Sequence, residues 1–382
     1  MIETNINILQ NKFHRLLEIF INSSSFSKKA KILFPLNKAI DIFSIKELID
    51  EINSILNINR MPITNTELAI YVSDIYKVLS KTDLPKTIYE KEIKCKFNYL
   101  TDNYNDGKKK IVNNLVEFLK AKGFYSYLDL FIIHGSYSTL DYEDNISDLD
   151  TLILINDETL LNQNKLLELQ EIVFNSFEYF YEIDLLHHHG YFVLTNFDLN
   201  YYNETFFPTM LFDYSTSVYQ SKESFLFNIR NYDNEKKLIL DSTLSYIENT
   251  NPNTLNTLMS YKVYFQVIQL IPIAYLQYLN NNTYKKYSFD LFLKDFPQYK
   301  DFFSQIYDIR LNWKQNSIKK YRFLKLFNIL KNRHILFLNS KLEKVSSKKI
   351  VQLGEVQYTT ILKPMINDIR NKLEEGKMNE NI

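Results

Sequence analysis

Apolar residues recur every three or four positions over roughly the first hundred residues of the chain. A first set follows this spacing near the start, and a second set with the same spacing spans residues 64–79. The first set is Leu9, Phe13, Leu16, Leu17 and Phe20. Such spacing predicts amphipathic helices. We therefore expect residues 1–98 to form a helical N-terminal region, in which no candidate chemistry stands out.

The pattern changes after a polar loop at residues 102–107. An amphipathic stretch over 109–122 predicts a helix, and a longer one follows at 158–177. Short apolar runs separate these helices and predict strands. The expected strands are 128–133, 148–155, 181–187 and 191–195. Helices that alternate with short strands favour an α/β or α+β domain with a mixed sheet, which we place at 99–214.

Helical spacing returns from about residue 215 and is strongest at 255–279 and 317–338. We therefore expect a helical C-terminal domain over 215–382. The most apolar stretch, 263–279, is interrupted by three glutamines and a proline. It is too short and too polar for a usual membrane span, so it predicts a buried helix and no membrane partner.

Composition narrows the possible partners. The chain carries 45 acidic and 45 basic residues, which gives a formal net charge of zero. A dedicated nucleic-acid binder usually has a basic surplus. The single Cys95 can form neither an internal disulfide nor a cysteine zinc cluster, and the start of the chain lacks the features of a signal peptide. These features favour a reducing, cytoplasmic location.

Candidate chemistry begins at Gly135 and Ser136. The chain has only six glycines, and Gly135 lies between an apolar run and a serine. A glycine lets the backbone approach a ligand closely. Ser136 can offer a hydroxyl and a backbone N–H to a phosphate oxygen, and a helix beginning here would add a positive dipole. A Gly-Ser pair alone is also common in ordinary turns.

Two carboxylates, Asp148 and Asp150, open the apolar run that follows. Side chains alternate along a strand, so both would project from the same face. Carboxylates on one face repel each other unless a cation lies between them, and their hard oxygen atoms suit Mg²⁺, or Mn²⁺ in its place. The alternative is a polar turn that leads into a strand.

A third carboxylate, Asp184, lies in the apolar run expected to form a strand at 181–187. A buried carboxylate without a partner is unfavourable, and a metal ion would remove that penalty. If this strand neighbours the strand of Asp148, three carboxylates converge. The alternative is an edge strand on which Asp184 faces water.

Three histidines follow directly after Asp184 along the chain. By alternation, His188 shares a face with Asp184 and is a candidate to contact substrate or to orient the carboxylate. His187 and His189 would share the other face, where zinc binding is an alternative, although no third ligand is evident. Structural packing of all three is the remaining interpretation.

Together, the Gly135-Ser136 turn and the run from Ser147 to Leu152 resemble the signature of the DNA polymerase beta-type nucleotidyltransferase superfamily. The Ser-Asp-Leu-Asp form is similar to that of bacterial adenylyl- and uridylyltransferases. The resemblance covers about residues 109–195. It implies an α+β fold of nucleotidyltransferase type, with a mixed sheet flanked by helices and helical regions on both sides in sequence.

The resemblance also implies a reaction. Two metal ions would bind Asp148, Asp150 and Asp184, while Gly135 and Ser136 hold the β- and γ-phosphates of a nucleoside triphosphate such as ATP. A lysine from the C-terminal helical region often contacts the triphosphate in this family, which suggests Lys286 or Lys285. The alternative for these lysines is a solvated helix start.

The expected function is therefore transfer of a nucleoside monophosphate to an acceptor hydroxyl with release of pyrophosphate. The zero net charge favours a small molecule or a protein as acceptor over an RNA end. Other possibilities are an inactive interaction protein that retains the fold, a toxin or antitoxin component, and a DNA-repair polymerase. Growth inhibition on expression would identify a toxin, and template-dependent primer extension would identify a polymerase.

Overall fold

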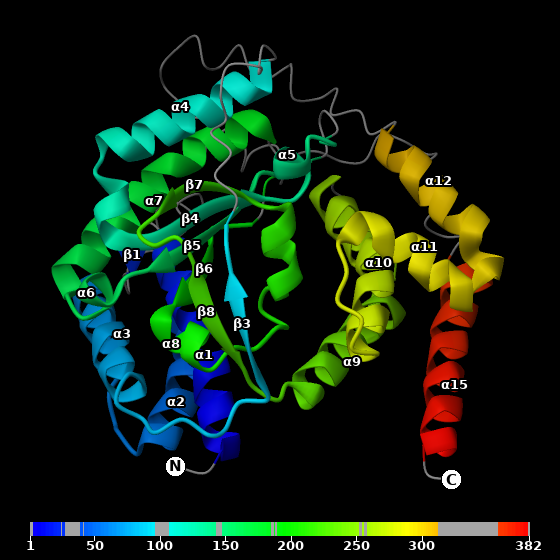
Figure 1. Ribbon diagram of the computed structural model, residues 1–382, viewed down its shortest axis with the longest axis horizontal. Coiled ribbons are helices and arrows are strands. Elements are labelled where there is room, and N and C mark those ends of the chain that lie inside the picture. The colour runs from blue at the N-terminus through cyan, green and yellow to red at the C-terminus, as the bar shows by residue number, and fades with distance from the viewer. Residues whose placement is uncertain are drawn as a thin grey trace. The chain divides into compact units, whose positions relative to one another are not determined.

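The structure is a computed structural model (Figure 1). It describes residues 3–23, 25–26, 39–40, 42–95, 107–142, 147–184, 187, 189–251, 254–255, 258–311 and 358–380. The described residues form two compact units, one ending at Asn231 and the other beginning at Tyr232. All strands of the described residues lie in the first unit.

A four-stranded mixed sheet forms the centre of the first unit, in the order β6-β5-β4-β7. Its strands are β4 (Leu128–His134), β5 (Asp150–Ile155), β6 (Phe192–Thr195) and β7 (Thr216–Gln220). Strand β4 is antiparallel to both of its neighbours, whereas β5 and β6 are parallel. Because β4 and β5 are antiparallel neighbours, the end of β4 and the start of β5 lie side by side.

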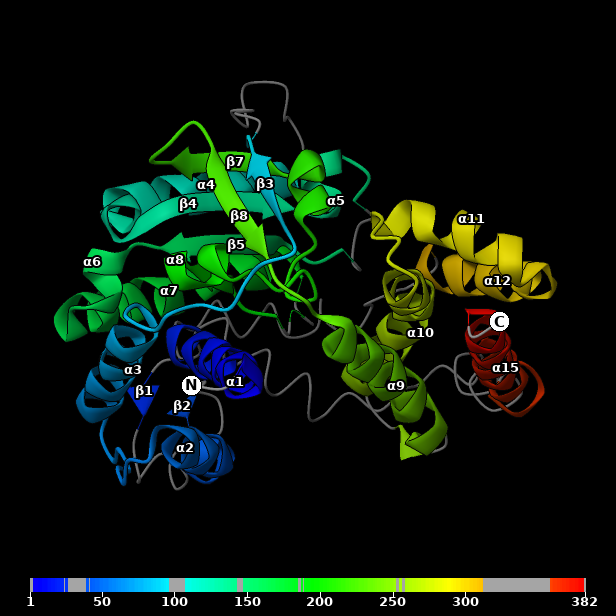
Figure 2. The same ribbon diagram turned by 60° about the horizontal axis from the view of Figure 1, so that its bottom comes forward.

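Two smaller pairs of strands complete the sheet structure of this unit. Strand β3 (Tyr89–Ile93) is antiparallel to β8 (Phe225–Ile229), and these two segments are far apart in sequence. The short strands β1 (Ser25–Phe26) and β2 (Ala39–Ile40) are parallel. Figure 2 shows β3 and β8 beside each other.

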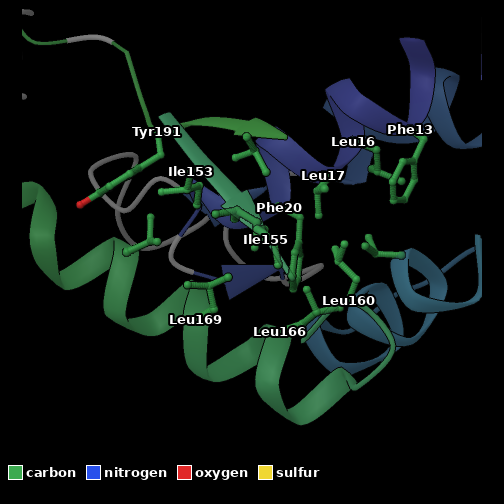
Figure 3. Close-up of a cluster of buried hydrophobic side chains, with 14 of the residues drawn as sticks. Phe13, Leu16, Leu17, Phe20, Ile153, Ile155, Leu160, Leu166, Leu169 and Tyr191 are labelled. Atoms are coloured by element: carbon green, nitrogen blue, oxygen red, sulfur yellow. The ribbon is translucent and has the colours of Figure 1, made fainter. Parts of the chain in front are cut away.

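The helices of the N-terminal region share one hydrophobic core with the sheet. The helices that contribute to it are α1 (Glu3–Ile21), α2 (Ile42–Leu56), α3 (Asn65–Leu79), α4 (Gly107–Ala121) and α7 (Gln163–Ile183). Figure 3 shows Phe20 of α1 and Leu169 of α7 gathered around Ile153 and Ile155 of β5. Each such side chain stabilises the fold by about 1.5–3 kcal/mol when fully buried. The N-terminal helices are therefore part of the core that supports the sheet.

The opposite face of the sheet carries aromatic contacts. Phe207 contacts the ring of His134 at the end of β4 and the ring of Phe192 on β6. Its ring also contacts Phe212, which in turn packs on Phe227 of β8.

The short elements of the unit are η1 (Phe124–Tyr127), α5 (Ser136–Thr139), α6 (Asp157–Leu160), α8 (Asn196–Asn200) and η2 (Thr209–Tyr214).

The second unit is helical in its described residues. Its elements are α9 (Asp233–Asn249), α10 (Leu258–Tyr278), α11 (Lys285–Asp295), η4 (Pro297–Tyr299), α12 (Lys300–Leu311), η7 (Tyr358–Leu362) and α15 (Lys363–Glu380). Arg370 of α15 donates two hydrogen bonds to the carboxylate of Glu248 on α9. The Tyr299 hydroxyl donates to Asp368. These bonds tie α15 to segments far from it in sequence.

The protein is thus a mixed α/β protein with a helical majority and a small mixed sheet, consistent with the expected α+β class. The strands expected at 128–133 and 191–195 are confirmed. The helix expected at 255–279 is also confirmed, as α10, whereas the one expected at 317–338 lies outside the described residues. None of the helices in the described part of the chain combines the length and apolar character that crossing a bilayer requires.

Three expectations about secondary structure are wrong. Residues 1–98 were expected to be helical, yet β1, β2 and β3 lie within that range. Helical structure was expected from residue 215, yet β7 and β8 follow that position and belong to the first unit. The strand expected at 181–187 does not form either, because α7 continues to Ile183. Val173, Phe177 and Phe180 are all buried and follow helical spacing, so the helix remains amphipathic to its end.

Candidate active site

The candidate site forms where β4 ends and β5 begins. His134, the last residue of β4, is the cross-strand partner of Asp150, the first residue of β5. Paired residues of an antiparallel sheet project from the same face, so the two side chains are neighbours. Burial lowers the pKa of His134 to about 3, so this imidazole is neutral at pH 7. Gly135 follows directly and begins the next turn.

Gly135 meets the carboxylate of Asp150 at very short range. A Cβ atom built on Gly135 would lie 2.5 Å from the Oδ2 atom of Asp150. Its backbone has φ 68° and ψ −154°, a combination that is essentially restricted to glycine. Gly135 therefore lies against one of the two predicted carboxylates, whereas its close approach to a ligand stays a prediction.

Ser136 begins a single helical turn, α5. The N–H groups of Ser138 and Thr139 both donate to the Gly135 carbonyl oxygen and close this turn. The Ser138 hydroxyl lies 2.9 Å from the Thr216 hydroxyl, which connects the turn to β7. One turn of helix is too short for the cumulative dipole expected here. The contribution of Ser136 therefore depends on its own hydroxyl and backbone N–H.

Asp148 lies just before β5 and is 8% exposed. Its Oδ2 atom is 3.7 Å from the Nε2 atom of His189, whose side chain is about half exposed. Asp150 is partly buried. Asp148 and Asp150 thus flank the buried Leu149 at the start of the strand, one beside a histidine and the other against Gly135.

Asp184 is the residue that ends helix α7, not a member of a strand. It is 1% exposed, and its backbone N–H donates to the Phe180 carbonyl oxygen. The short apolar run around it is ambiguous in sequence, because strands and buried helix ends share such runs. The expected strand register for Asp184 is therefore wrong, whereas its expected burial is confirmed.

The segment after Asp184 leads back toward Asp148. The His187 N–H donates to the Asp184 carbonyl oxygen, and the His187 ring packs on Phe180. The rings of His187 and His189 are 6.1 Å apart in an edge-on arrangement. The chain thus runs from Asp184 to the histidine beside Asp148 within five residues. His188, predicted to contact substrate, lies outside the described residues.

The predicted metal ligands have the chemistry of a Mg²⁺ site, which is built from carboxylate oxygens. Asp148 and Asp150 are separated by one residue at the start of β5, and the Asp150 carboxylate occupies the space that a Cβ on Gly135 would fill. Within the described ranges, no group of three or more His, Cys, Asp or Glu side chains is arranged to hold a metal ion. Convergence of Asp184 with the other two, and zinc at the histidines, therefore stay predictions.

Lys285 and Lys286 lie in the first turn of α11, in the second unit. Lys286 is exposed, and Lys285 is partly buried. This accords with a helix start, and the contact of either lysine with a triphosphate stays a prediction.

Two residues near the site were missed by sequence reasoning. The side chain of Asn22, at the end of α1, accepts a hydrogen bond from the Tyr191 N–H and donates one to the Tyr191 carbonyl oxygen. A Cβ on Gly190 would lie 2.2 Å from this Asn22 side chain. The scarcity of glycine is a signal that could have marked Gly190, whereas nothing local marks Asn22.

Comparison with known proteins assigns no family. No protein-family model matches the chain, and neither a curated protein nor a solved structure matches it. The function is therefore inferred from the residues and contacts of the candidate site alone.

Proposed function

We propose that the protein is a metal-dependent nucleotidyltransferase that moves a nucleoside monophosphate from a nucleoside triphosphate to an acceptor hydroxyl. The observation that carries this proposal is the pairing of His134 with Asp150. That pairing places the Gly135-Ser136 turn directly against one of two acidic residues at the start of β5. A phosphate-binding turn and a metal-binding pair must be adjacent for this chemistry, because a metal held by the carboxylates would have to act on the bound triphosphate.

The turn supplies the phosphate contacts in this proposal. Gly135 exposes backbone without a side chain, and Ser136 adds a hydroxyl and an N–H at the first position of α5. Hydrogen bonds to a charged group are typically worth about 1.5–3 kcal/mol each. The β- and γ-phosphates would therefore be oriented by the turn while the α-phosphorus faces the carboxylates.

Asp148 and Asp150 would hold the first of two magnesium ions, and Asp184 would complete the ligands of the second. When bound, the ion neutralises the triphosphate charge and makes the α-phosphorus more electrophilic. Mn²⁺ has the same preference for oxygen ligands and would substitute for it. The buried position of Asp148 strengthens its interaction with a cation, since fewer water dipoles screen the charge.

The reaction forms one bond and breaks another. The acceptor oxygen attacks the α-phosphorus in line, and the bond from that phosphorus to the bridging oxygen of pyrophosphate breaks. The proton of the acceptor hydroxyl passes to a carboxylate, for which Asp184 is the candidate. Pyrophosphate leaves with the electron pair of the broken bond, so charge and atoms balance.

The acceptor class follows from charge. With 45 acidic and 45 basic residues, the chain has no overall attraction for a polyanion. A small molecule or a protein is therefore the proposed acceptor, in preference to nucleic acid.

The test is incubation of the protein with each α-labelled triphosphate, Mg²⁺ or Mn²⁺, and a cell extract separated into small molecules, proteins and nucleic acids. Label should move into one fraction with wild type and not with Asp148→Asn. Asp129→Asn is the matched control, because Asp129 lies at the opposite end of β4 and accepts a hydrogen bond from Ser221. Equal labelling by wild type and Asp148→Asn would contradict the proposal, as would metal binding with no transfer to any fraction.

A further inference from the structure

Tyr191, which directly precedes β6, is held by the end of helix α1. Asn22 forms two hydrogen bonds with the backbone of Tyr191, of 2.7 Å to its N–H and 2.8 Å to its carbonyl oxygen. The same amide group also donates to the Glu18 carbonyl oxygen within α1. The Asn22 carboxamide thus forms with Tyr191 the two backbone hydrogen bonds that a neighbouring strand would form.

Gly190 is required for this contact. Any side chain at this position would overlap Asn22, because a Cβ would lie 2.2 Å from its Cγ atom. On the other side, the fully buried Tyr191 places its hydroxyl 2.8 Å from the Ser176 hydroxyl on α7. Its ring also packs on Phe180. Tyr191 is therefore fixed by three different contacts.

His189 lies between two fixed points. His187, on one side, is held by the Asp184 carbonyl oxygen and by the Phe180 ring. Tyr191, on the other, is held by Asn22. The imidazole of His189 lies beside the carboxylate of Asp148, with 3.7 Å between Nε2 and Oδ2. Tyr191, two residues after His189, is held by elements far from it in sequence.

We propose that His189 is a positioning residue for Asp148 and that Asn22 holds it in place. This inference rests on the proposed function, in which Asp148 is a metal ligand. A carboxylate that binds metal works best in one orientation, and a neighbouring side chain that restricts it raises affinity and rate. The N-terminal region, through Asn22, therefore belongs to the active centre.

The kinetic test compares Asn22→Ala, His189→Ala and the double variant. Loss of such an outer partner typically lowers metal affinity or activity by about 10- to 100-fold. We expect each single variant to lower kcat by this factor and to weaken Mn²⁺ binding, measured by electron paramagnetic resonance, with little change in KM for the triphosphate. If Asn22 acts through His189, the double variant resembles His189→Ala alone. Additive losses would overturn this link.

Controls separate positioning from folding. Asn53→Ala is matched, because the Asn53 amide also bonds a backbone carbonyl and a second partner, at Arg60 and Tyr71. It should lower the melting temperature without lowering kcat. Asn22→Asp keeps the acceptor for Tyr191 N–H and replaces the donor with a charged oxygen that repels the Tyr191 and Glu18 carbonyl oxygens, so it tests the same contact by a different change. His189→Gln should recover part of the lost rate.

The geometry itself is tested without any transfer reaction. In protein labelled with ¹⁵N-histidine, the ring signals of His189 should shift in both Asp148→Asn and Asn22→Ala, and stay in place in Asn53→Ala. Unshifted signals would overturn the inference even if the enzyme is active. Wild-type protein that neither binds Mn²⁺ nor transfers nucleotide would contradict the proposed function instead, and with it the catalytic part of this inference.

Discussion

The two ends of strand β4 carry the same residue types in different surroundings. Each end has a glycine with φ 68°, Gly123 shortly before the strand and Gly135 directly after it. Each end also has two aspartates close by, Asp129 with Asp157 at the start of β4 and Asp148 with Asp150 at its end. What differs is the set of groups that these carboxylates meet.

At the start of β4, the carboxylates meet hydroxyl and amide donors. The Ser221 hydroxyl donates to Asp129, and the Tyr76 hydroxyl donates to Asp157. The amide of Asn196 donates to both aspartates. These hydrogen bonds give Asp129 and Asp157 a structural role, because hydrogen bonds to a charged group stabilise the fold.

At the end of β4, the contacts of the carboxylates include a glycine and a histidine. Gly135 lies against Asp150, and His189 lies beside Asp148. The backbone conformation of Gly135 is essentially restricted to glycine, a form of strain that tends to occur at functional sites. A pair of aspartates is present at both ends of β4 and therefore does not identify a site by itself. The contact between Gly135 and Asp150 is what distinguishes the end of the strand from its start.

The largest expected effect comes from Asp148→Asn and Asp150→Asn. Each should lower the transfer rate by roughly 100- to 1,000-fold or more, the range found when one electrostatically stabilising group is removed from an active site. Removing one of two like charges should leave the melting temperature unchanged or raise it. Steady-state kinetics at saturating Mg²⁺ and thermal melting measure the two effects.

Asp129→Asn and Asp157→Asn are the corresponding changes at the other end of β4. They should lower stability slightly and leave kcat unchanged. If they abolish transfer as strongly as Asp148→Asn does, the proposed distinction between the two ends is wrong.

Gly135→Ala should have the next largest effect, because it should reduce both the stability of the fold and the transfer activity. Its backbone conformation is unfavourable for alanine by about 1–3 kcal/mol, and the new Cβ would displace Asp150. Gly123→Ala is the matched change, because Gly123 has ψ 21°, an ordinary left-handed conformation, and nothing lies within 4 Å of a Cβ there. Its stability loss should be about 1–2 kcal/mol with normal kcat. Equal losses of kcat in both variants would exclude a special role for the Gly135 contact.

Ser136→Ala should have a smaller effect on activity alone. One hydrogen bond to a charged phosphate is worth about 1.5–3 kcal/mol, which corresponds to roughly 10- to 100-fold in rate or affinity. Ser126→Ala is the control at the other end of β4, where that hydroxyl donates to the Gly123 carbonyl oxygen. Complete loss of transfer in well-folded Ser136→Ala would mean that the serine does more than hold phosphate.

The contacts that distinguish the two ends were only partly predictable from sequence. The strand of β4 follows from its run of apolar residues, and Gly135 stands out because glycine is scarce. Asp148 and Asp150 follow from alternation, although β5 begins at Asp150 and not at Asp148. Local patterns of this kind are visible because each depends on neighbours along the chain.

The missing parts depend on contacts between distant segments. Asn22 lies 169 positions from Tyr191, and β3 pairs with β8 across more than a hundred residues. The hydrophobic periodicity of a sequence does not show which distant segments contact each other. The secondary structure around Asp184 was predicted wrongly for a different reason, since the apolar run there suits a strand as well as the end of a helix. Packing of α7 on the sheet decides between them.

The smallest expected effect concerns Asp184, and it is a shift in melting temperature. Asp184 ends α7, where the helix dipole places partial negative charge, and its side chain is almost fully buried. A carboxylate at this position is disfavoured by about 0.3–1 kcal/mol from the dipole alone. Proximity to Asp148 and Asp150 would add repulsion. Asp184→Asn should therefore melt higher than wild type without metal, by ~1–4 °C for a domain of this size.

Metal should reverse the order of the two proteins. A ligand that binds only the folded state stabilises it further as the free ligand concentration rises above Kd, so Mg²⁺ or Mn²⁺ should raise the wild-type melting temperature, and more so with a triphosphate present. Asp184→Asn should gain less, because one ligand is lost, and should bind nucleotide through Asp148 and Asp150 without transferring it. Asp129→Asn, at the other end of β4, should gain as much as wild type. A wild-type melting temperature that ignores metal, or an active Asp184→Asn enzyme, would remove Asp184 from the site and leave it as the end of a helix.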